Sequence, residues 1–396
     1  MAKKRARASK ARARPSRSKT AKGRPRPASP LPLPKPALQR APTPIRSPLR
    51  DLERNFEIAL SRPKVSVVIA NHNGVDALWH CLFALKTQTT APHEIILVDN
   101  ASEDASVAFV QSNYPQVRIL ECQEDFGPAM GFNLGVKTAT GHLVALLDPE
   151  TVVTPDWLER VVRDFQKCWP RSGVLVAPVS NGEREKGGGR TLNFLGNPIE
   201  GFWAEPLEVF CPGEGTVFFP RFLAPDGPFD EDYFFCREDA YLGWKFRLAG
   251  YATSLSPETK VFQKEEEGAY PEWKSIYFSN RNRWLNILLF YETRNLLKIL
   301  PLMAVEGFLR LARSLGTGFG AFWGTTCALA WIAGHPRLIL RKRQAIQAKR
   351  KIPDADILRY LSGRVVRDGG IFSRVLNLVS LAYCRWVGLE ALEWQE

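Results

Sequence analysis

The stretch Val65-Ser66-Val67-Val68-Ile69-Ala70-Asn71 decides the fold class of this 396-residue chain. It is a short apolar run that ends in a polar residue, as expected of a strand that is buried on both faces. Runs of the same kind recur at residues 94–98, 117–120 and 143–147. Helix-like segments separate them, at about residues 75–87, 105–114 and 129–138. This alternation predicts an α/β fold with a Rossmann-like, mostly parallel sheet and right-handed crossovers.

Polar side chains follow three of the four predicted strands. Asn71 to Asn73 follow the first strand, which we predict over residues 65–70, Asp99-Asn100 follows the second, and Asp148-Pro149-Glu150 follows the fourth. Ligands of a parallel sheet bind outside the carboxyl ends of its strands. We therefore expect these polar groups to lie around one binding site.

Each carboxylate has a binding interpretation and a structural one. Asp99 can accept hydrogen bonds from a base or from ribose hydroxyls, or it can simply stabilise a turn. Asp148 and Glu150 can share a hard divalent cation with a substrate diphosphate, whereas Asp-Pro is also a good turn sequence. Their common position at strand ends favours the binding interpretation.

A later helix, predicted over residues 238–249 and ended by Gly250, begins with Glu238-Asp239. Acids in a first helical turn complement the helix dipole. Asp239 could also be a general base that is held at the start of the helix, although the residues alone favour the helix-dipole interpretation. Between the sheet and this helix, Gly187-Gly188-Gly189 predicts a mobile loop over residues 181–196.

The net charge of +13 is concentrated in the N-terminal segment. Residues 1–50 hold 16 of the 54 Lys and Arg residues and no Asp or Glu, so the rest of the chain, with 38 basic and 41 acidic residues, is close to neutral. We interpret residues 1–55 as a disordered basic tail. It could act as a solubilising arm or be attracted to an anionic membrane surface. Specific nucleic-acid binding is disfavoured, because no aromatic side chains interleave with the charges.

The C-terminal part is predicted to be helical, which gives three parts: the tail, a sheet domain over residues 60–270 and a helical, membrane-associated region over residues 271–396. Residues 315–334 carry no charge and are flanked by basic residues. Such a segment could lie in a membrane interface, pack inside the protein or span a bilayer. Seven cysteines without a C-x-x-C pair favour reduced thiols in a cytoplasmic protein.

Five motifs carry a resemblance to a known family, over residues 65–291. They begin at Val65-Ser66-Val67, Ile95-Ile96-Leu97, Asp125-Phe126-Gly127, Leu146-Leu147-Asp148 and Gly227-Pro228-Phe229, the last followed by Glu238-Asp239. The chain resembles the family-2 glycosyltransferases of the GT-A fold, especially bacterial rhamnosyltransferase-like members. The resemblance implies an inverting enzyme that moves a sugar from a nucleotide-diphosphate sugar to a hydroxyl of a glycan or lipid-linked acceptor. Cell-envelope polysaccharide synthesis, peripheral at the inner face of the cell membrane, would be its setting.

The resemblance also implies residue roles. Asp239 matches the catalytic base, and Asp148 and Glu150 match the pair that holds a divalent metal, Mg²⁺ or Mn²⁺. The donor nucleotide sugar would be bound by six residues: Asn71, Asp99, Gly127, Asn133, Asp148 and Arg281.

Two positions depart from the family pattern. The family usually has Asp where this chain has Glu150, and often His where it has Gln263. These changes leave open a catalytically degenerate scaffold or binding protein. A sugar-phosphate nucleotidyltransferase is a further alternative, although that class calls for a Gly-rich basic loop after the first strand, and Asn71-His72-Asn73-Gly74 is not one.

Overall fold

The structure is a computed structural model that describes residues 48–180, 185–186, 188–199, 207–213, 215–259, 261–263, 270–365 and 370–389. The chain divides into two units, Met1–Arg46 and Ser47–Glu396, and the described helices and strands all belong to the second. The predicted tail up to residue 47 lies outside the described residues. For residues 48–55 the prediction of disorder is wrong, because they belong to helix α1 (Pro48–Ala59), which packs Phe56 into the core.

The predicted parallel α/β sheet is confirmed. Among the described residues its main path runs β10-β13-β6-β12-β4-β1-β2-β3. One half is parallel throughout and consists of β1 (Val65–Asn71), β2 (Glu94–Asp99), β3 (Arg118–Glu121) and β4 (Leu143–Leu147). We expected all four strands to be buried on both faces, and for β3 this is wrong. Its residues are exposed or half-buried, because β3 is the edge strand of this half.

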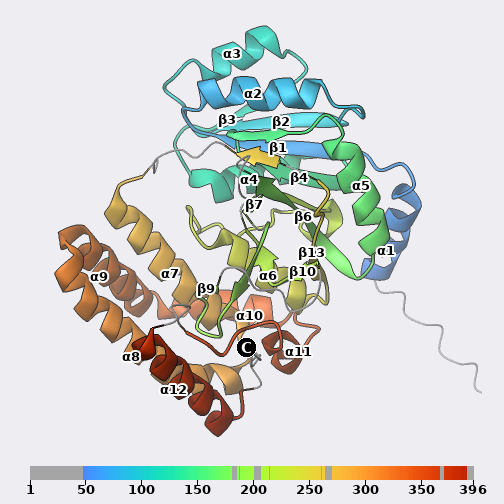
Figure 1. Ribbon diagram of the computed structural model, residues 1–396. Helices are drawn as coiled ribbons and strands as arrows, with labels where there is room; N and C mark the ends of the chain where they lie inside the picture. The colour runs from blue at the N-terminus through green and yellow to red at the C-terminus, as the bar shows by residue number, and fades with distance from the viewer. Residues whose placement is uncertain are drawn as a thin grey trace, which may run out of the picture. The chain divides into compact units, whose positions relative to one another are not determined.

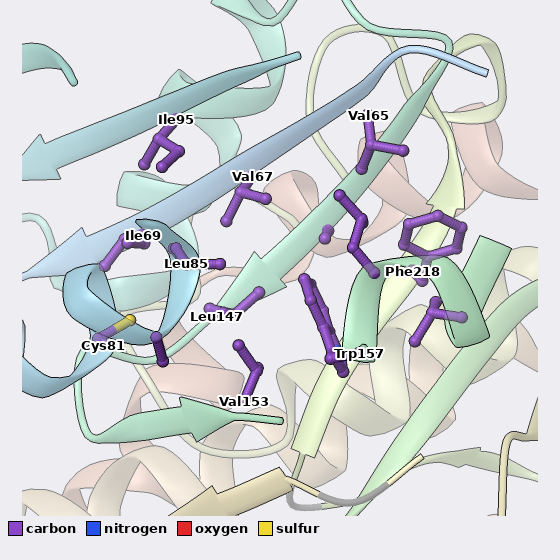
Figure 2. Packing of buried hydrophobic residues seen from close by; sticks show 14 of the residues in the cluster. Val65, Val67, Ile69, Cys81, Leu85, Ile95, Leu147, Val153, Trp157 and Phe218 are labelled. Carbon is purple, nitrogen blue, oxygen red and sulfur yellow. The ribbon is translucent and has the colours of Figure 1, made fainter. Parts of the chain in front are cut away.

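Crossover helices cover both faces of the parallel half, as the alternating pattern predicts. They are α2 (Val75–Lys86), α3 (Ser106–Asn113) and α4 (Gly127–Thr138), and α5 (Trp157–Cys168) follows β4 and β5. Figure 2 shows Val65, Val67 and Ile69 of β1 pointing into the core that also contains Leu85 and Trp157. The alternate residues of β1, such as Val68, pack against α4 on the opposite face. This two-sided burial explains why the strand reads as a continuous apolar run.

The other half of the sheet is mixed. It contains β5 (Thr151–Val153), β6 (Ser172–Ser180), β7 (Glu185–Lys186), β10 (Glu208–Val209), β12 (Gly215–Pro220), β13 (Ala252–Leu255) and β14 (Val261–Gln263). Strand β12 runs antiparallel to both β4 and β6, so it joins the two halves. The short 3₁₀ helix η1 (Arg221–Leu223) follows β12.

A separate three-stranded sheet has one strand, β8, in the region of residues 181–196 that we expected to be a loop. It consists of β8 (Gly189–Leu192), β9 (Pro198–Ile199) and β11 (Cys211–Pro212). Within residues 181–196, positions 181–184 and 187 lie outside the described residues. The loop expectation is wrong for β8, because Gly189 packs so closely on Val209 that the sheet needs a residue without a side chain there.

The predicted C-terminal helical region is present. Its elements are α7 (Glu272–Phe290), α8 (Thr293–Thr317), α9 (Phe319–Gly334), α10 (Pro336–Gln347), α11 (Asp354–Leu358) and α12 (Ile371–Val387). The helix predicted before this region is also present, as α6 (Glu238–Leu248). Figure 1 shows α7, α8, α9 and α12 on the side of the protein away from β1, β2 and β3. One hydrophobic core includes Trp244 of α6, Phe290 of α7 and Met303 of α8. Residues on both sides of the expected boundary near residue 270 therefore share a core.

The uncharged run at residues 315–334 is not one helix. Gly318, with φ of 138°, separates α8 from α9. Helix α9 packs on α7 through small residues; a side chain at Gly324 would come within 2.5 Å of the Trp273 carbonyl oxygen. Within the described part of the chain, no helix combines the length and apolar character needed to cross a bilayer.

Candidate active site

Asn71 and Asp99 lie side by side at the carboxyl ends of β1 and β2. They are register partners in the parallel ladder, and Asn71 Nδ2 donates a hydrogen bond to Asp99 Oδ1 over 3.0 Å. Ser102 completes the group: its hydroxyl donates to Asp99 Oδ1 over 2.6 Å, and its backbone N–H donates to Asp99 Oδ2 over 2.9 Å. The side chains of Asn71 and Asp99 are buried. The network fixes the Asp99 carboxylate at the sheet edge.

The turn after β1 meets the turn after β4 next to this network. A side chain at Gly74 would lie 2.6 Å from Asn71 Oδ1 and 3.7 Å from Pro149 Cβ. Asn71 Oδ1 itself is buried and has no hydrogen-bond partner among the described residues. The Asp99 network and the Asp148-Pro149-Glu150 segment are therefore neighbours, as the sequence predicts from their positions at strand ends.

Gln263, the residue at the unusual position, lies beside Asp148. Strand β14 pairs antiparallel with β5, which places Gln263 opposite Thr151. From there Gln263 Nε2 donates a long hydrogen bond of 3.4 Å to Asp148 Oδ2. The side chain at position 263 is thus well placed to orient the Asp148 carboxylate.

Asp148 and Glu150 make a donor set suited to a cation that is shared with a substrate. Among the described residues, no three His, Cys, Asp or Glu side chains are grouped as a protein-only metal site. Mg²⁺ in nucleotide sites is usually held by one or two carboxylates together with substrate phosphates. Two half-buried carboxylates in the same turn fit that mode of binding, because the diphosphate would supply the remaining oxygens.

Asp239 is held at the start of α6 by an ion pair that the sequence did not predict. Arg190 Nη1 of β8 donates to Asp239 Oδ2 over 2.9 Å. Asp239 Oδ1 accepts the backbone N–H of Ala240 over 2.7 Å. Immediately before the helix, Cys236 and Arg237 both have left-handed backbone angles, with φ of 67° and 65°. Such strain in residues other than glycine is often found at functional sites.

Glu238 connects this helix start electrostatically with Asp148. Burial is the main cause that raises the pKa of Glu238 to about 7, and the negative charges of Asp239 and then Asp148 contribute to the same shift. Its Oε2 atom is buried without a hydrogen-bond partner among the described residues. Asp148, Glu238 and Asp239 therefore share one electrostatic environment, although Asp148 comes from a different part of the sheet.

Arg281 and its neighbour Asn282 support the loop before α6. Asn282 Nδ2 donates to the carbonyl oxygens of Phe235 and Cys236, at 3.0 and 2.7 Å. Arg281 is buried, donates to the Asp232 carbonyl oxygen and lies over the ring of Phe278. In this structure the contacts of Arg281 are with the loop and with aromatic rings, so its predicted role in binding the donor stays a prediction.

Gly127 and Asn133 also contact protein backbone. Gly127 has φ of 77°, and a side chain there would lie 2.4 Å from the Phe234 carbonyl oxygen. Asn133 uses both ends of its amide on Phe229, accepting from its N–H at 2.9 Å and donating to its carbonyl at 3.1 Å. These contacts join α4 to the segment that leads into α6. Their predicted contacts with the donor stay predictions.

Three residues of the site carry little signal in the sequence. Arg190 lies after the glycine run, where the pattern predicts a loop. No sequence pattern indicates that it pairs with Asp239. Glu238 is visible as half of the Glu238-Asp239 pair, yet its burial follows only from the packing of α6. Tyr270 is a third case: its hydroxyl lies 3.3 Å from Asp125 Oδ2, just before Gly127.

The fold and the site together define an α/β protein with carboxylates gathered at the carboxyl edge of a parallel sheet, which is the arrangement of the GT-A class. The family described as Glycosyl transferase family 2 matches residues 66–223, from β1 to the end of η1. The chain therefore carries a domain of glycosyl transferase family 2.

Individual relatives agree with the family match. The chain is 32% identical over 105 residues to the uncharacterized glycosyltransferase YwdF of Bacillus subtilis, which covers 26% of this chain and 38% of that protein. It is 26% identical over 228 residues to the O-antigen biosynthesis protein RfbC of Myxococcus xanthus, covering 51% of this chain and 17% of that protein. The matched region thus spans well under half the length of these relatives. The crystal structure of S. aureus TarS 1-349 in complex with UDP-GlcNAc has a TM-score of 0.48 at 19% identity, covering 72% of this chain and 88% of that one.

Proposed function

We propose that the chain is an inverting glycosyltransferase that moves one sugar from a nucleotide-diphosphate sugar to a hydroxyl of a glycan or lipid-linked acceptor. The observation that carries the proposal is the Asn71–Asp99 network beside the turn that holds Asp148, together with the Asp239 carboxylate that Arg190 fixes at the start of α6. A donor site and a proton acceptor are the two parts that such a reaction requires. The family match of residues 66–223 supports the same reaction class.

The nucleoside of the donor binds at the Asn71–Asp99 network. Asp99 accepts hydrogen bonds from the base or the ribose, since a carboxylate offers only acceptors. Three donated hydrogen bonds already hold Asp99 in place, which reduces the ordering that binding would otherwise require. The buried, unpartnered Asn71 Oδ1 is an acceptor for a further donor group of the ligand.

Asp148 and Glu150 hold a divalent cation, Mg²⁺ or Mn²⁺, together with the diphosphate. When bound, such an ion offsets the charge that develops on the departing diphosphate. Gln263 orients the Asp148 carboxylate through its hydrogen bond. Glu150 remains a hard oxygen ligand, one methylene longer than the aspartate usual in the family.

Asp239 removes the proton of the acceptor hydroxyl. The hydroxyl oxygen forms a bond to the anomeric carbon as the bond to the diphosphate breaks on the opposite face, and the configuration inverts. The transition state has oxocarbenium character, as in glycoside hydrolysis. Arg190 holds the Asp239 carboxylate in position through the 2.9 Å ion pair. The transferred proton resides on Asp239 until solvent removes it.

The acceptor belongs to a cell-envelope polysaccharide or its lipid-linked precursor, and the protein works peripherally at the inner face of the cell membrane. The partial similarity to an O-antigen biosynthesis protein supports the polysaccharide assignment. The basic N-terminal segment supports attraction to an anionic surface.

Calorimetry with UDP-, GDP- and dTDP-sugars, with and without Mn²⁺, tests the donor site. We expect one nucleotide class to bind, and slow release of the nucleoside diphosphate when the donor is incubated with enzyme. Binding without any release, even with added acceptor glycans, would favour the degenerate scaffold. Formation of a nucleotide sugar from a nucleoside triphosphate and a sugar phosphate would favour the nucleotidyltransferase, and no binding at all would overturn the proposal.

A further inference from the structure

Helix α8 exposes a continuous apolar stripe to solvent. Leu297, Val305, Phe308 and Leu315 are exposed large apolar residues, with Phe308 at 70% and Leu315 at 68%. Their spacing of eight, three and seven residues places them on one face of the helix. Pro301 and Ala312, also exposed, fill the gaps in this face. We call these six residues the α8 stripe.

The opposite face of α8 is already used for packing. Leu296, Ile299, Met303 and Gly307 are buried against the rest of the protein. The stripe is thus a second apolar face on the same helix, and it is not needed for the fold. Soluble proteins rarely leave contiguous apolar surface of this kind exposed unless it is a site of interaction.

Two neighbouring helices also expose apolar side chains. Phe319 and Trp323 of α9 stack on each other directly after the Gly318 break, with ring centroids 6.2 Å apart, and both are exposed. Helix α12 exposes Leu378 and Trp386, and it is attached to the start of α8 by a hydrogen bond of 2.6 Å from the Tyr383 hydroxyl to the Lys298 carbonyl oxygen. Figure 1 shows these three helices grouped at one end of the structure.

The charge of these helices identifies the surface that they fit. Helices α8, α9 and α12 contain six Lys and Arg residues and one acidic residue, Glu306. Glu306 is itself paired with Arg283 at 2.6 Å and with Arg310. Apolar faces flanked by basic residues, with their acid neutralised, are complementary to an anionic lipid bilayer.

We propose that the α8 stripe, with Phe319 and Trp323, is a docking surface that inserts into the headgroup region of an anionic membrane. Its long axis lies in the membrane plane, so the apolar side chains reach the acyl boundary while the exposed Arg313 contacts headgroups. The inference deepens the proposed peripheral location by naming the surface, and it does not depend on the transfer chemistry.

Vesicle flotation of the full chain tests this surface. The double variant Phe308→Glu/Leu315→Glu places two charges in the stripe, and Ile58→Glu is the matched control, since Ile58 of α1 is equally exposed at 68% but lies outside the stripe. All three proteins keep the basic N-terminal segment, so its attraction to the vesicles is common to them. Experiments at ~0.5 M salt further screen that attraction.

We expect wild type and Ile58→Glu to float with vesicles of phosphatidylcholine and phosphatidylglycerol. The double variant should bind these vesicles at least about tenfold more weakly. Wild type should bind pure phosphatidylcholine vesicles more weakly than the anionic mixture. Equal binding of all three proteins to the anionic vesicles would overturn the proposal.

A second copy of the chain is the rival occupant of the stripe. Sedimentation velocity distinguishes it: a wild-type dimer that becomes monomeric in the double variant would also overturn the proposal. Unchanged circular dichroism and unchanged nucleotide affinity in the double variant serve as folding controls. These readouts separate failure of the surface from failure of the proposed transferase function, which calorimetry reports independently.

Discussion

Arg190 and Asp239 form an ion pair of 2.9 Å although they lie 49 residues apart. The arginine comes from β8 in the small three-stranded sheet, and the aspartate from the first turn of α6. The pair joins a segment outside the main sheet to the residue that we propose as the base. It therefore makes the geometry of Asp239 depend on the folding of the region around β8.

Asp239→Asn tests the base most directly. The amide cannot accept a proton from the acceptor, so we expect sugar transfer to fall by roughly 10² to 10⁴ while calorimetric binding of the nucleotide is retained. Asp51→Asn, which removes an exposed carboxylate on α1, serves as the control and should transfer normally. Unchanged turnover in Asp239→Asn would rule this residue out as the base.

Asp99→Asn should weaken nucleotide binding. The amide can no longer accept hydrogen bonds at both positions from Asn71 and Ser102, so the network must rearrange around a buried donor. We expect the dissociation constant of the nucleoside diphosphate to rise about tenfold or more. The unfolding midpoint, measured in parallel, separates lost binding from lost folding. An unaltered dissociation constant would contradict a nucleoside site at this network.

Asp148→Asn should abolish the effect of metal on nucleotide binding. Wild type is expected to bind the nucleoside diphosphate about tenfold more tightly with Mn²⁺ than with a chelator, since the ion is shared by carboxylate and phosphates. In the variant the two affinities should be nearly equal. The same ratio in both proteins would show that Asp148 does not hold the ion.

Glu238 should make stability depend on pH in a direction unusual for an acid. Its pKa is raised from the unfolded value of 4.5 to about 7 in the folded protein. The contribution of Glu238 to the free energy of unfolding is therefore complete below pH 4.5 and is lost as the pH rises through about 7. From the pKa shift we expect a loss of ~2–3 kcal/mol. Urea unfolding of wild type and Glu238→Gln with chelator present measures it. The variant should lose less stability than wild type between pH 5 and 8, and parallel curves would contradict the assignment.

Gly127→Ala should destabilise the protein by ~2 kcal/mol or more, because the new side chain meets the Phe234 carbonyl oxygen in a left-handed backbone. Gly316→Ala is the matched control. Gly316 lies near the end of α8 with open space around it, so alanine should be neutral or stabilising by ~0.5–1 kcal/mol. Equal thermal midpoints for the two variants would show that the 127–234 contact is dispensable.

The sequence predicts those parts of the molecule that depend on local patterns. Buried parallel strands have continuous apolar sequences. For this reason β1, β2 and β4 and the polar residues at their ends can be predicted. The edge strand β3 is not distinguished by its pattern, because edge position depends on the whole sheet. Arg190 and Glu238 escape prediction for a related reason: an ion pair across 49 residues and a buried carboxylate arise from tertiary packing alone.

The hydrogen bonds from Asn282 to Phe235 and Cys236 have a consequence for how this chain can be dissected. A fragment that stops near residue 270 would retain every strand of the main sheet and yet lose the side chain that ties down the approach to α6. Truncation at that point should also expose the core that α6 shares with α7 and α8, so the fragment should be less stable than the full chain. The C-terminal helices therefore support the segment that positions Asp239 and do not form a separate domain.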